Sequence, residues 1–330
     1  MTNVIIRCDA ALLPEIGTGH AVRMAQFSSE LALSQRLLVK FVSRTFNEFS
    51  IISEILKDKS SFYSFDDQQL IPNTEAEAQT LASCNEDVII FDRLETSKDL
   101  IHFLRYNGKK VVSFDDQGDG STLTNLTINS LVDAYDSKFP NILESYKYLI
   151  KKNSGHAVQK RKNRIFISCG GFDHSKIIIK LIEKIDFEKF SDYHFDFIVG
   201  NKPQYDELNQ LIKFKDIPNI LFLERPKNFF KLLATSKAAI ITGGLTLFDA
   251  ICLKVPTLSL AQYQHQERNI RKLSQLGLTT PCNIDSHPQL LNEILAQILE
   301  IKNNDLYCQE EIDNKGIERV ISLLKKHEIL

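Results

Sequence analysis

The chain has no excess of either charge, no paired cysteine motif and no long apolar run, and each absence excludes a class of protein. Its 40 basic and 42 acidic residues nearly cancel, so neither a nucleic-acid partner nor a membrane-surface partner is favoured. The six cysteines are scattered without a Cys-x-x-Cys pair, which argues against structural zinc and fits a reduced, cytoplasmic protein. No apolar run approaches the roughly 20 residues of a membrane helix. No signal-like segment precedes the first candidate strand, so we expect a cytoplasmic protein without membrane insertion.

A third glycine is also missing from the first glycine-rich turn, Ile16-Gly17-Thr18-Gly19-His20. This turn follows the apolar run at 4–6 and precedes a stripe of apolar residues at helical spacing from Ala21 to Ala32. Two glycines at the start of a helix allow close backbone approach to an anion such as a diphosphate. The dinucleotide fingerprint is incomplete, however, so NAD or FAD is not favoured and no cofactor is expected.

A length of 330 residues predicts two domains, which we place at 1–150 and 151–330. In both halves buried-type strands alternate with helical stretches, and each half begins with a strand, a glycine pair and a helix. This pattern predicts an α/β fold of two Rossmann-like domains with parallel sheets, facing a cleft at the carboxyl ends of their strands. The basic segment at 151–164 contains no aromatic residue and is interpreted as a linker.

The elements follow from the apolar runs and the glycine turns between them. In the first half, strands are predicted at 4–6, 37–42, 62–65, 88–91, 111–114 and 126–128, and helices at 47–56, 74–82 and 98–106. In the second half, strands are predicted at 165–167, 194–199, 220–223, 238–241 and 257–260, and helices at 178–185, 204–214, 228–236, 245–253, 266–276, 288–301 and 310–325.

Two more glycine pairs stand at strand ends in the second half: Gly170-Gly171 and Gly243-Gly244. The backbone N–H groups after Gly244, beginning with Leu245 and Thr246, favour phosphate oxygens. Asp249 follows one helical turn later, where a carboxylate can accept hydrogen bonds from ribose hydroxyls. Together these features predict a nucleotide diphosphate site.

Several motifs, in order, resemble the UDP-sugar hydrolase of pseudaminic acid biosynthesis and its relatives, the spore-coat polysaccharide proteins described as predicted glycosyltransferases. The resemblance rests on 6–10, on 16–20 with Arg23, on 113–116, on 167–173 and on 242–269, and it spans about residues 4 to 280. It implies that His20 is the general base that activates water.

Two segments also resemble the UDP-binding half of the lipid-linked peptidoglycan GlcNAc transferase: 242–249 and 264–269. This resemblance implies the GT-B fold, UDP held mainly by the C-terminal half with Asp249 at the ribose, and no metal. The residues expected to contact the UDP-sugar are Asp9, Gly17, Thr18, Gly19, Arg23, Gly170, Gly171, Gly243, Gly244, Leu245, Thr246, Asp249, His265, Gln266 and Asn269. Asp9, Arg7 and Arg23 are equally compatible with a structural ion pair under the first loop.

The reaction stays open at this point. Arg93 and Leu94 stand where the hydrolase usually has histidine and tyrosine, and Asp116-Gln117-Gly118 is closer to the spore-coat proteins. The main hypothesis is a metal-independent hydrolase that releases UDP and a free diacetamido-trideoxy type sugar. The alternative is a GT-B glycosyltransferase in which the same histidine deprotonates an acceptor hydroxyl. A sugar-nucleotide epimerase, or a binding protein without turnover, is the third possibility.

Overall fold

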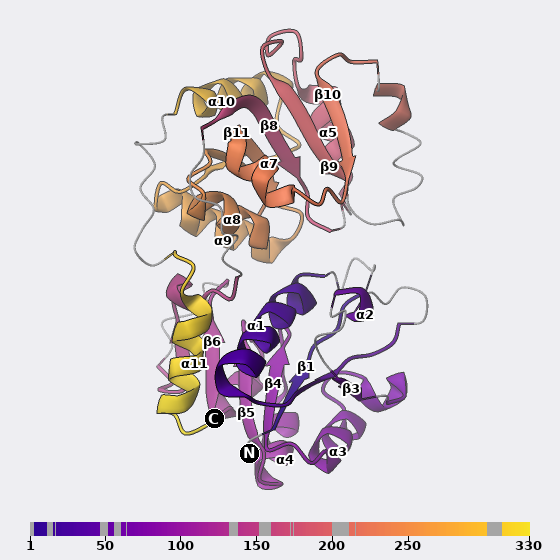
Figure 1. Ribbon diagram of the computed structural model, residues 1–330, viewed down its shortest axis with the longest axis vertical. Coiled ribbons are helices and arrows are strands. Elements are labelled where there is room, and N and C mark those ends of the chain that lie inside the picture. Colours follow the sequence, from indigo (N-terminus) through magenta and orange to yellow (C-terminus); the bar gives the residue numbers. More distant parts are fainter. Residues whose placement is uncertain are drawn as a thin grey trace. The chain divides into compact units, whose positions relative to one another are not determined.

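The computed structural model describes residues 3–11, 16, 18–46, 52–55, 61–63, 65–131, 138–151, 160–171, 173, 175–199, 211–214, 216–301 and 312–330. The chain forms two compact units (Figure 1). The first consists of Met1–Lys152 together with Asp313–Leu330, and the second of Asn153–Ile312.

The first unit is built on a sheet of seven parallel strands in the order β3-β2-β1-β4-β5-β6-β7. These strands are β1 (Val4–Arg7), β2 (Val39–Val42), β3 (Ser61–Tyr63), β4 (Val88–Asp92), β5 (Lys110–Phe114), β6 (Leu126–Asn129) and β7 (Ile142–Glu144). The central strands are apolar on both sides because helices cover both faces, as expected of a parallel sheet.

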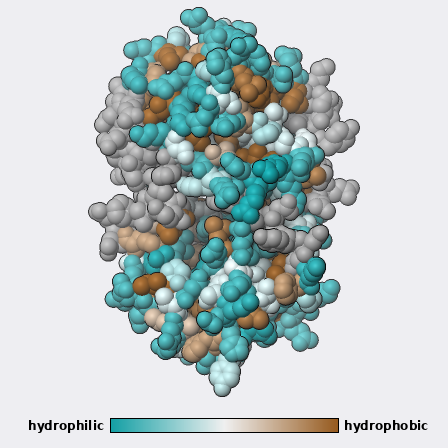
Figure 2. Space-filling view, turned by 180° about the vertical axis from the view of Figure 1, so that it is seen from behind, coloured by the Kyte–Doolittle hydropathy of each residue, from teal (hydrophilic) through white to brown (hydrophobic). Residues whose placement is uncertain are grey.

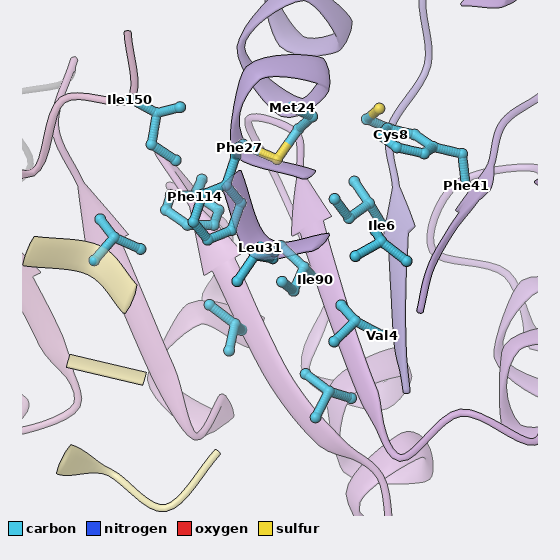
Figure 3. Close-up of a cluster of buried hydrophobic side chains, with 14 of the residues drawn as sticks. Val4, Ile6, Cys8, Met24, Phe27, Leu31, Phe41, Ile90, Phe114 and Ile150 are labelled. Atoms are coloured by element: carbon cyan, nitrogen blue, oxygen red, sulfur yellow. The ribbon is translucent and has the colours of Figure 1, made fainter. Parts of the chain in front are cut away.

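The helices of this unit divide between those two faces. They are α1 (Gly19–Gln35), α2 (Ile52–Ile55), α3 (Glu75–Ser83), α4 (Lys98–Tyr106) and α11 (Gly316–Lys326), with short 3-10 turns at Asp67–Leu70, Asp119–Leu123 and Tyr146–Tyr148. On one face, α1 directs Met24, Phe27 and Leu31 toward Ile90 and Phe114 (Figure 3). On the other face, α3 and α4 contribute to the core that includes Ile5, Ile89 and Val111.

The C-terminal helix departs from the expected division at residue 150, which assigns it to the second domain. Val320, Ile321 and Leu324 of α11 are buried in the same core as α1, in the first unit. At the start of α11, a Cβ on Gly316 would meet the carbonyl oxygen of Leu149 at 2.0 Å. The apolar stripe of α11 therefore finds its partner in the first sheet, and the last residues return to that unit.

The second unit contains a sheet of six parallel strands in the order β10-β9-β8-β11-β12-β13. These are β8 (Lys162–Ser168), β9 (His194–Val199), β10 (Ile220–Glu224), β11 (Ser236–Thr242), β12 (Thr257–Leu260) and β13 (Thr280–Pro281). Its helices are α5 (Ile177–Lys184), α7 (Phe229–Thr235), α8 (Leu245–Cys252), α9 (Gln264–Gln275) and α10 (Pro288–Glu300), with a 3-10 turn at Ile212–Phe214. The predicted helix at 204–214 falls mostly outside the described residues.

Both sheets change winding direction at their centre. In the first unit the chain moves from β1 to β2 on one side and later to β4 on the other; in the second, β8 lies between β9 and β11. Open α/β sheets bind ligands at the carboxyl ends of strands at such a switch point, because the loops there diverge. The loops after β1 and β4, and those after β8 and β11, are therefore the expected ligand-binding loops.

Among the described residues, no helix combines the length and the apolar composition required to cross a lipid bilayer. On the face shown in Figure 2, the coloured residues are mostly hydrophilic and the apolar ones form small, separate groups. Small groups of apolar side chains are ordinary on a protein surface.

Candidate functional site

His20 is the second residue of α1, and its ring lies against the end of β4. Its Nδ1 donates to Asp92 Oδ1 across 2.7 Å. An ionised carboxylate only accepts hydrogen bonds, so Nδ1 carries a proton, and in the neutral ring Nε2 has the free lone pair. The side chain of His20 is 27% exposed, and among the described residues Nε2 has no protein partner. The ring is thus arranged to accept a proton from a bound molecule.

Asp92 is fully buried and is held as an anion by Arg23, one turn after His20 on α1. Arg23 Nε donates to Asp92 Oδ2 at 2.6 Å, and Nη2 contacts Oδ1. Burial opposes the charge of Asp92, but Arg23 and His20 outweigh it and hold the pKa of this carboxyl at about 2. Asp92 is therefore negative at neutral pH.

Arg23 also contacts a second buried carboxylate, because its Nη1 donates to Asp115 Oδ2. Asp115 directly follows β5 and has a φ of 50°. Its Oδ1 accepts from the backbone N–H groups of Ser130 at 2.6 Å and of Leu131 at 2.8 Å. The ends of β4, β5 and β6 are thus linked through one arginine.

Asp9 belongs to a separate ionic network after β1. It pairs with Arg7 and accepts from Arg44 through the backbone N at 3.0 Å and Nε at 2.9 Å. Burial opposes its charge, yet Arg7 and Arg44 hold the pKa of Asp9 at about 2. Arg7 continues to Glu77, which also pairs with Arg93. Arg7 and Asp9 therefore form an ion pair, whereas Arg23 pairs elsewhere.

The remaining predicted residues of the first loop lie at the start of α1. Thr18 occupies the N-cap position, and among the described residues its side chain makes no capping hydrogen bond. Gly19 is exposed, and a Cβ there would have nothing within 4 Å. Gly17 lies outside the described residues.

Asp116 has a structural role. Its oxygens accept from Thr96 N at 2.9 Å, Thr96 Oγ1 at 2.6 Å and Gly118 N at 3.0 Å. Burial raises the pKa of this carboxyl. Both Asp115 and Asp116 are thus engaged by protein donors, and within the described part of the chain no group of three His, Cys, Asp or Glu side chains is arranged for a metal ion.

In the second unit, the turn after β11 is packed tightly on one side and open on the other. A Cβ on Gly243 would lie 3.0 Å from Gln266 and Ile270 of α9, whereas one on Gly244 would meet nothing within 4 Å. Gly244 caps α8, whose first residues are Leu245 and Thr246. Asp249 lies one turn along this helix and is half-buried.

Amide side chains of α9 and of the loop before it support this turn. Asn269 Nδ2 donates to the carbonyl oxygen of Gly243 at 3.3 Å, and Gln266 Oε1 accepts from the N–H of Gln262 at 2.9 Å. Gln262 Nε2 in turn donates to the carbonyl oxygen of Cys169, after β8, at 2.7 Å. His265 lies in the backbone of α9, but its side chain is outside the described residues.

Gly170 and Gly171 follow β8 at the switch point. Gly170 has a φ of +83°, which explains a glycine there, and its Cα faces open space. The N-terminus of the following α5 is already occupied, because Asp173 accepts from Ile177 N at 2.9 Å and Ile178 N at 2.8 Å. A ligand at this loop therefore meets the glycine backbone rather than the end of α5.

Sequence reasoning did not list Asp92 or Asp115 among the site residues, although each follows an apolar strand, at Val88-Ile89-Ile90-Phe91 and Val111-Val112-Ser113-Phe114. The structure adds two buried polar atoms at the end of β6. Asn129 Oδ1 and Ser130 Oγ have no hydrogen-bond partner among the described residues. Buried polar atoms are normally paired, so these two are exceptions among the described residues.

Comparisons with known proteins agree with this geometry at the level of the fold. No protein-family model matches the chain. The chain is 24% identical over 337 residues to the spore coat polysaccharide biosynthesis protein SpsG of Bacillus subtilis, covering 94% of this chain and 95% of that protein. It is 27% identical over 301 residues to the uncharacterised protein MJ1062 of Methanocaldococcus jannaschii, and this match covers 80% of the chain but only 58% of the archaeal protein.

Solved structures match over nearly the whole length. They include MurG of Acinetobacter baumannii (TM-score 0.66, 14% identity, 98% of this chain and 99% of that one). A putative UDP-N-acetylglucosamine 2-epimerase of Listeria monocytogenes gives 0.71 at 12% identity, covering 99% and 96%. The S. aureus MnaA–UDP complex gives 0.68 at 12% identity, covering 100% and 98%. The expected fold class is confirmed: the chain contains two Rossmann-like units with parallel sheets, the fold of the GT-B type.

Proposed function

We propose that the protein is a GT-B glycosyltransferase that passes a sugar from a UDP-sugar to a hydroxyl acceptor in polysaccharide biosynthesis. The observation that carries this proposal is the pair of His20 and Asp92 at the switch point of the first sheet, with Nε2 available to a bound molecule. The similarity to a spore coat polysaccharide biosynthesis protein, and to structures whose names include UDP or a UDP-sugar, supports the substrate class.

The second unit is proposed to hold the UDP moiety. Gly244 opens the N-terminal turn of α8, and the N–H groups of a helix start attract phosphate oxygens. Asp249 lies one turn further and is proposed to accept from the ribose hydroxyls. Gly170, Gly171 and the side of α9 near His265 complete the proposed site.

In the proposed reaction, His20 Nε2 removes the proton of the acceptor hydroxyl as its oxygen attacks the anomeric carbon. The new carbon–oxygen bond forms while the bond from that carbon to the diphosphate oxygen breaks, and UDP leaves with the electron pair. Asp92 stabilises the imidazolium that results. Backbone N–H groups offset charge on the leaving diphosphate. Asp115 and Asp116 are engaged by protein donors, which supports a reaction without a divalent metal.

Hydrolysis of the UDP-sugar remains a second candidate, because the same base serves when water replaces the acceptor. The observation that favours it is the partial exposure of the His20 ring, which leaves it accessible to water. In both reactions the proton goes to Nε2, so the two differ only in the attacking oxygen.

The deciding experiment measures UDP release from a panel of UDP-sugars, including diacetamido-trideoxy hexoses, with EDTA, and with or without oligosaccharide and lipid-linked acceptors. We expect release that depends on an acceptor, survives EDTA and disappears in His20→Ala. Release without any acceptor supports the hydrolase instead. A changed sugar that is still attached to UDP contradicts both and indicates an epimerase.

A further inference from the structure

We propose that Asp115 is a positioning residue that acts on His20 from a distance, through Arg23 and Asp92, and fixes the charge beneath the catalytic ring. The catalytic part of this inference rests on the proposed function. The electrostatic part concerns only the four side chains and can be tested whether or not turnover is found.

The geometry forms one continuous chain of contacts. His20 and Arg23 lie three residues apart on α1 and therefore on the same face of that helix. Arg23 donates from Nε and Nη2 to Asp92 and from Nη1 to Asp115, so each of its three guanidinium nitrogens has a carboxylate partner. Arg23, Asp92 and Asp115 are at most 1% exposed, whereas the ring of His20 reaches solvent.

The charges of the three buried groups leave a formal charge of −1 beneath the imidazole. When His20 accepts a proton, the four groups together become neutral. Arg23 alone would offset the charge of Asp92 and weaken its attraction for the proton, so Asp115 is the group that keeps the buried cluster negative. In a poorly solvated site this difference is large, because charges that water does not screen interact strongly.

Among the residues that the structure describes, the other charged groups near the cluster have partners of their own. From the end of β1, Arg7 and Asp9 face one another, and Arg7 also pairs with Glu77. Cys8 feels Asp92 and Arg23, but burial, followed by Asp92 and Asp9, raises the pKa of its thiol, so it stays neutral. Asp116, next to Asp115, is bound to Thr96. All these groups are the same in the variants below and cancel in the comparison.

The test uses three variants whose charge effects differ in sign. Asp115→Asn leaves the cluster neutral but keeps an oxygen for the N–H groups of Ser130 and Leu131. Arg23→Gln makes the cluster more negative. The double variant Arg23→Gln/Asp115→Asn restores the formal charge of −1 with both partners changed. If Asp115 had only a structural role, the titration midpoint of the His20 ring would shift in the same direction in all three variants.

The readout is the protonation of the His20 ring, followed by NMR of full-length protein labelled with ¹⁵N-histidine and assigned with His20→Gln. We expect the midpoint of the ring titration to move about one to two pH units lower in Asp115→Asn, higher in Arg23→Gln, and close to wild type in the double variant. The acid limb of kcat/KM should follow the same order.

Midpoints that shift in one direction in all variants, or do not shift, overturn the proposal. Should Asp115→Asn fail to fold, Arg23→Gln and the double variant still give opposite predictions against wild type. A wild-type protein without turnover whose ring titration follows the expected order contradicts the proposed function alone. Turnover with a titration that ignores Asp115 contradicts this inference alone.

Discussion

The two units present the same topological position with different chemistry. At the switch point of the first sheet, two buried carboxylates and one guanidinium group lie beneath one histidine: Asp92, Asp115 and Arg23. At the switch point of the second, glycine turns are held in place by amide side chains, Asn269 and Gln262. Buried charges fix the protonation of a reacting group, whereas glycine backbone allows close approach to a ligand. Under the proposed function, proton transfer falls to the first unit and nucleotide binding to the second.

The largest effect expected from this division is the loss of the base. In His20→Ala, kcat should fall about 10²- to 10⁴-fold, the contribution typical of a positioned general base. The affinity for UDP, measured by calorimetry, should stay within about twofold if the second unit binds the nucleotide. His102→Ala, an exposed position on α4, is the matched control and should change neither quantity. Loss of UDP affinity in His20→Ala would contradict the proposal that nucleotide binding lies in the second unit.

The two glycines after β11 allow the effects of packing and of ligand binding to be tested separately in the second unit. Gly243→Ala places a Cβ 3.0 Å from Gln266 and Ile270, and such overpacking should cost about 1 to 3 kcal/mol of unfolding free energy. Gly244→Ala meets open space and should cost about 1 kcal/mol or less, as a weaker helix cap. Its methyl group would instead obstruct the proposed phosphate site. Denaturant titrations and UDP calorimetry check the pair; equal loss of stability in both variants would contradict this account.

Acid should weaken the first unit before the second. The pKa values of Asp9 and Asp92 are lowered to about 2 in the folded protein. Their stabilisation is therefore complete above the unfolded value of about 4 and is lost as the pH falls toward 2, on the order of 2 kcal/mol for each group. In the second unit, burial raises the pKa of Asp196 despite Arg164. Protonation of this buried carboxylate in acid therefore removes an unfavourable charge and does not destabilise the second unit.

Hydrogen exchange measured by mass spectrometry at pH 6, 4 and 3 tests this difference between the units. Peptides from β1 and β4 should lose protection at a higher pH than those from β8 and β9. Asp9→Asn, which removes one of the lowered carboxyls, should flatten the decline in the first unit. An earlier loss of protection in the second unit would reverse the comparison.

Local sequence signals were sufficient for much of the fold. The apolar runs and glycine turns predict helix Lys98–Tyr106 and strand His194–Val199 with the bounds that the structure gives. The short edge strands β7 and β13 were not predicted, because they span three and two residues and are only partly buried. The position of α11 was also not predictable from its own stripe, since an amphipathic pattern shows that a helix packs but not against which sheet.

The ionic network of the site illustrates the same limit. The glycine turn and His20 are visible as a local motif, but Arg23 meets carboxylates 69 and 92 residues away in the sequence. Strand order decides which strand ends are neighbours, and that order depends on long-range packing. Asp92 and Asp115 were visible as strand-end residues, whereas their shared arginine required the structure.

The sharpest test of nucleotide binding by the second unit concerns Asp249. Asp249→Asn weakens hydrogen bonds from the ribose hydroxyls to a charged acceptor, and such bonds contribute about 1.5 to 3 kcal/mol. We expect KM for the UDP-sugar to rise about tenfold or more, while kcat changes little because the reacting centre is untouched. Asp285→Asn, at an exposed position in the same unit, serves as control. A 2′-deoxyuridine analogue should lose the same factor in wild type but almost nothing further in Asp249→Asn, since the two changes remove one interaction. If the losses from the analogue and from Asp249→Asn were additive, the ribose would not contact Asp249, and the proposed binding of UDP at the glycine turn would be wrong.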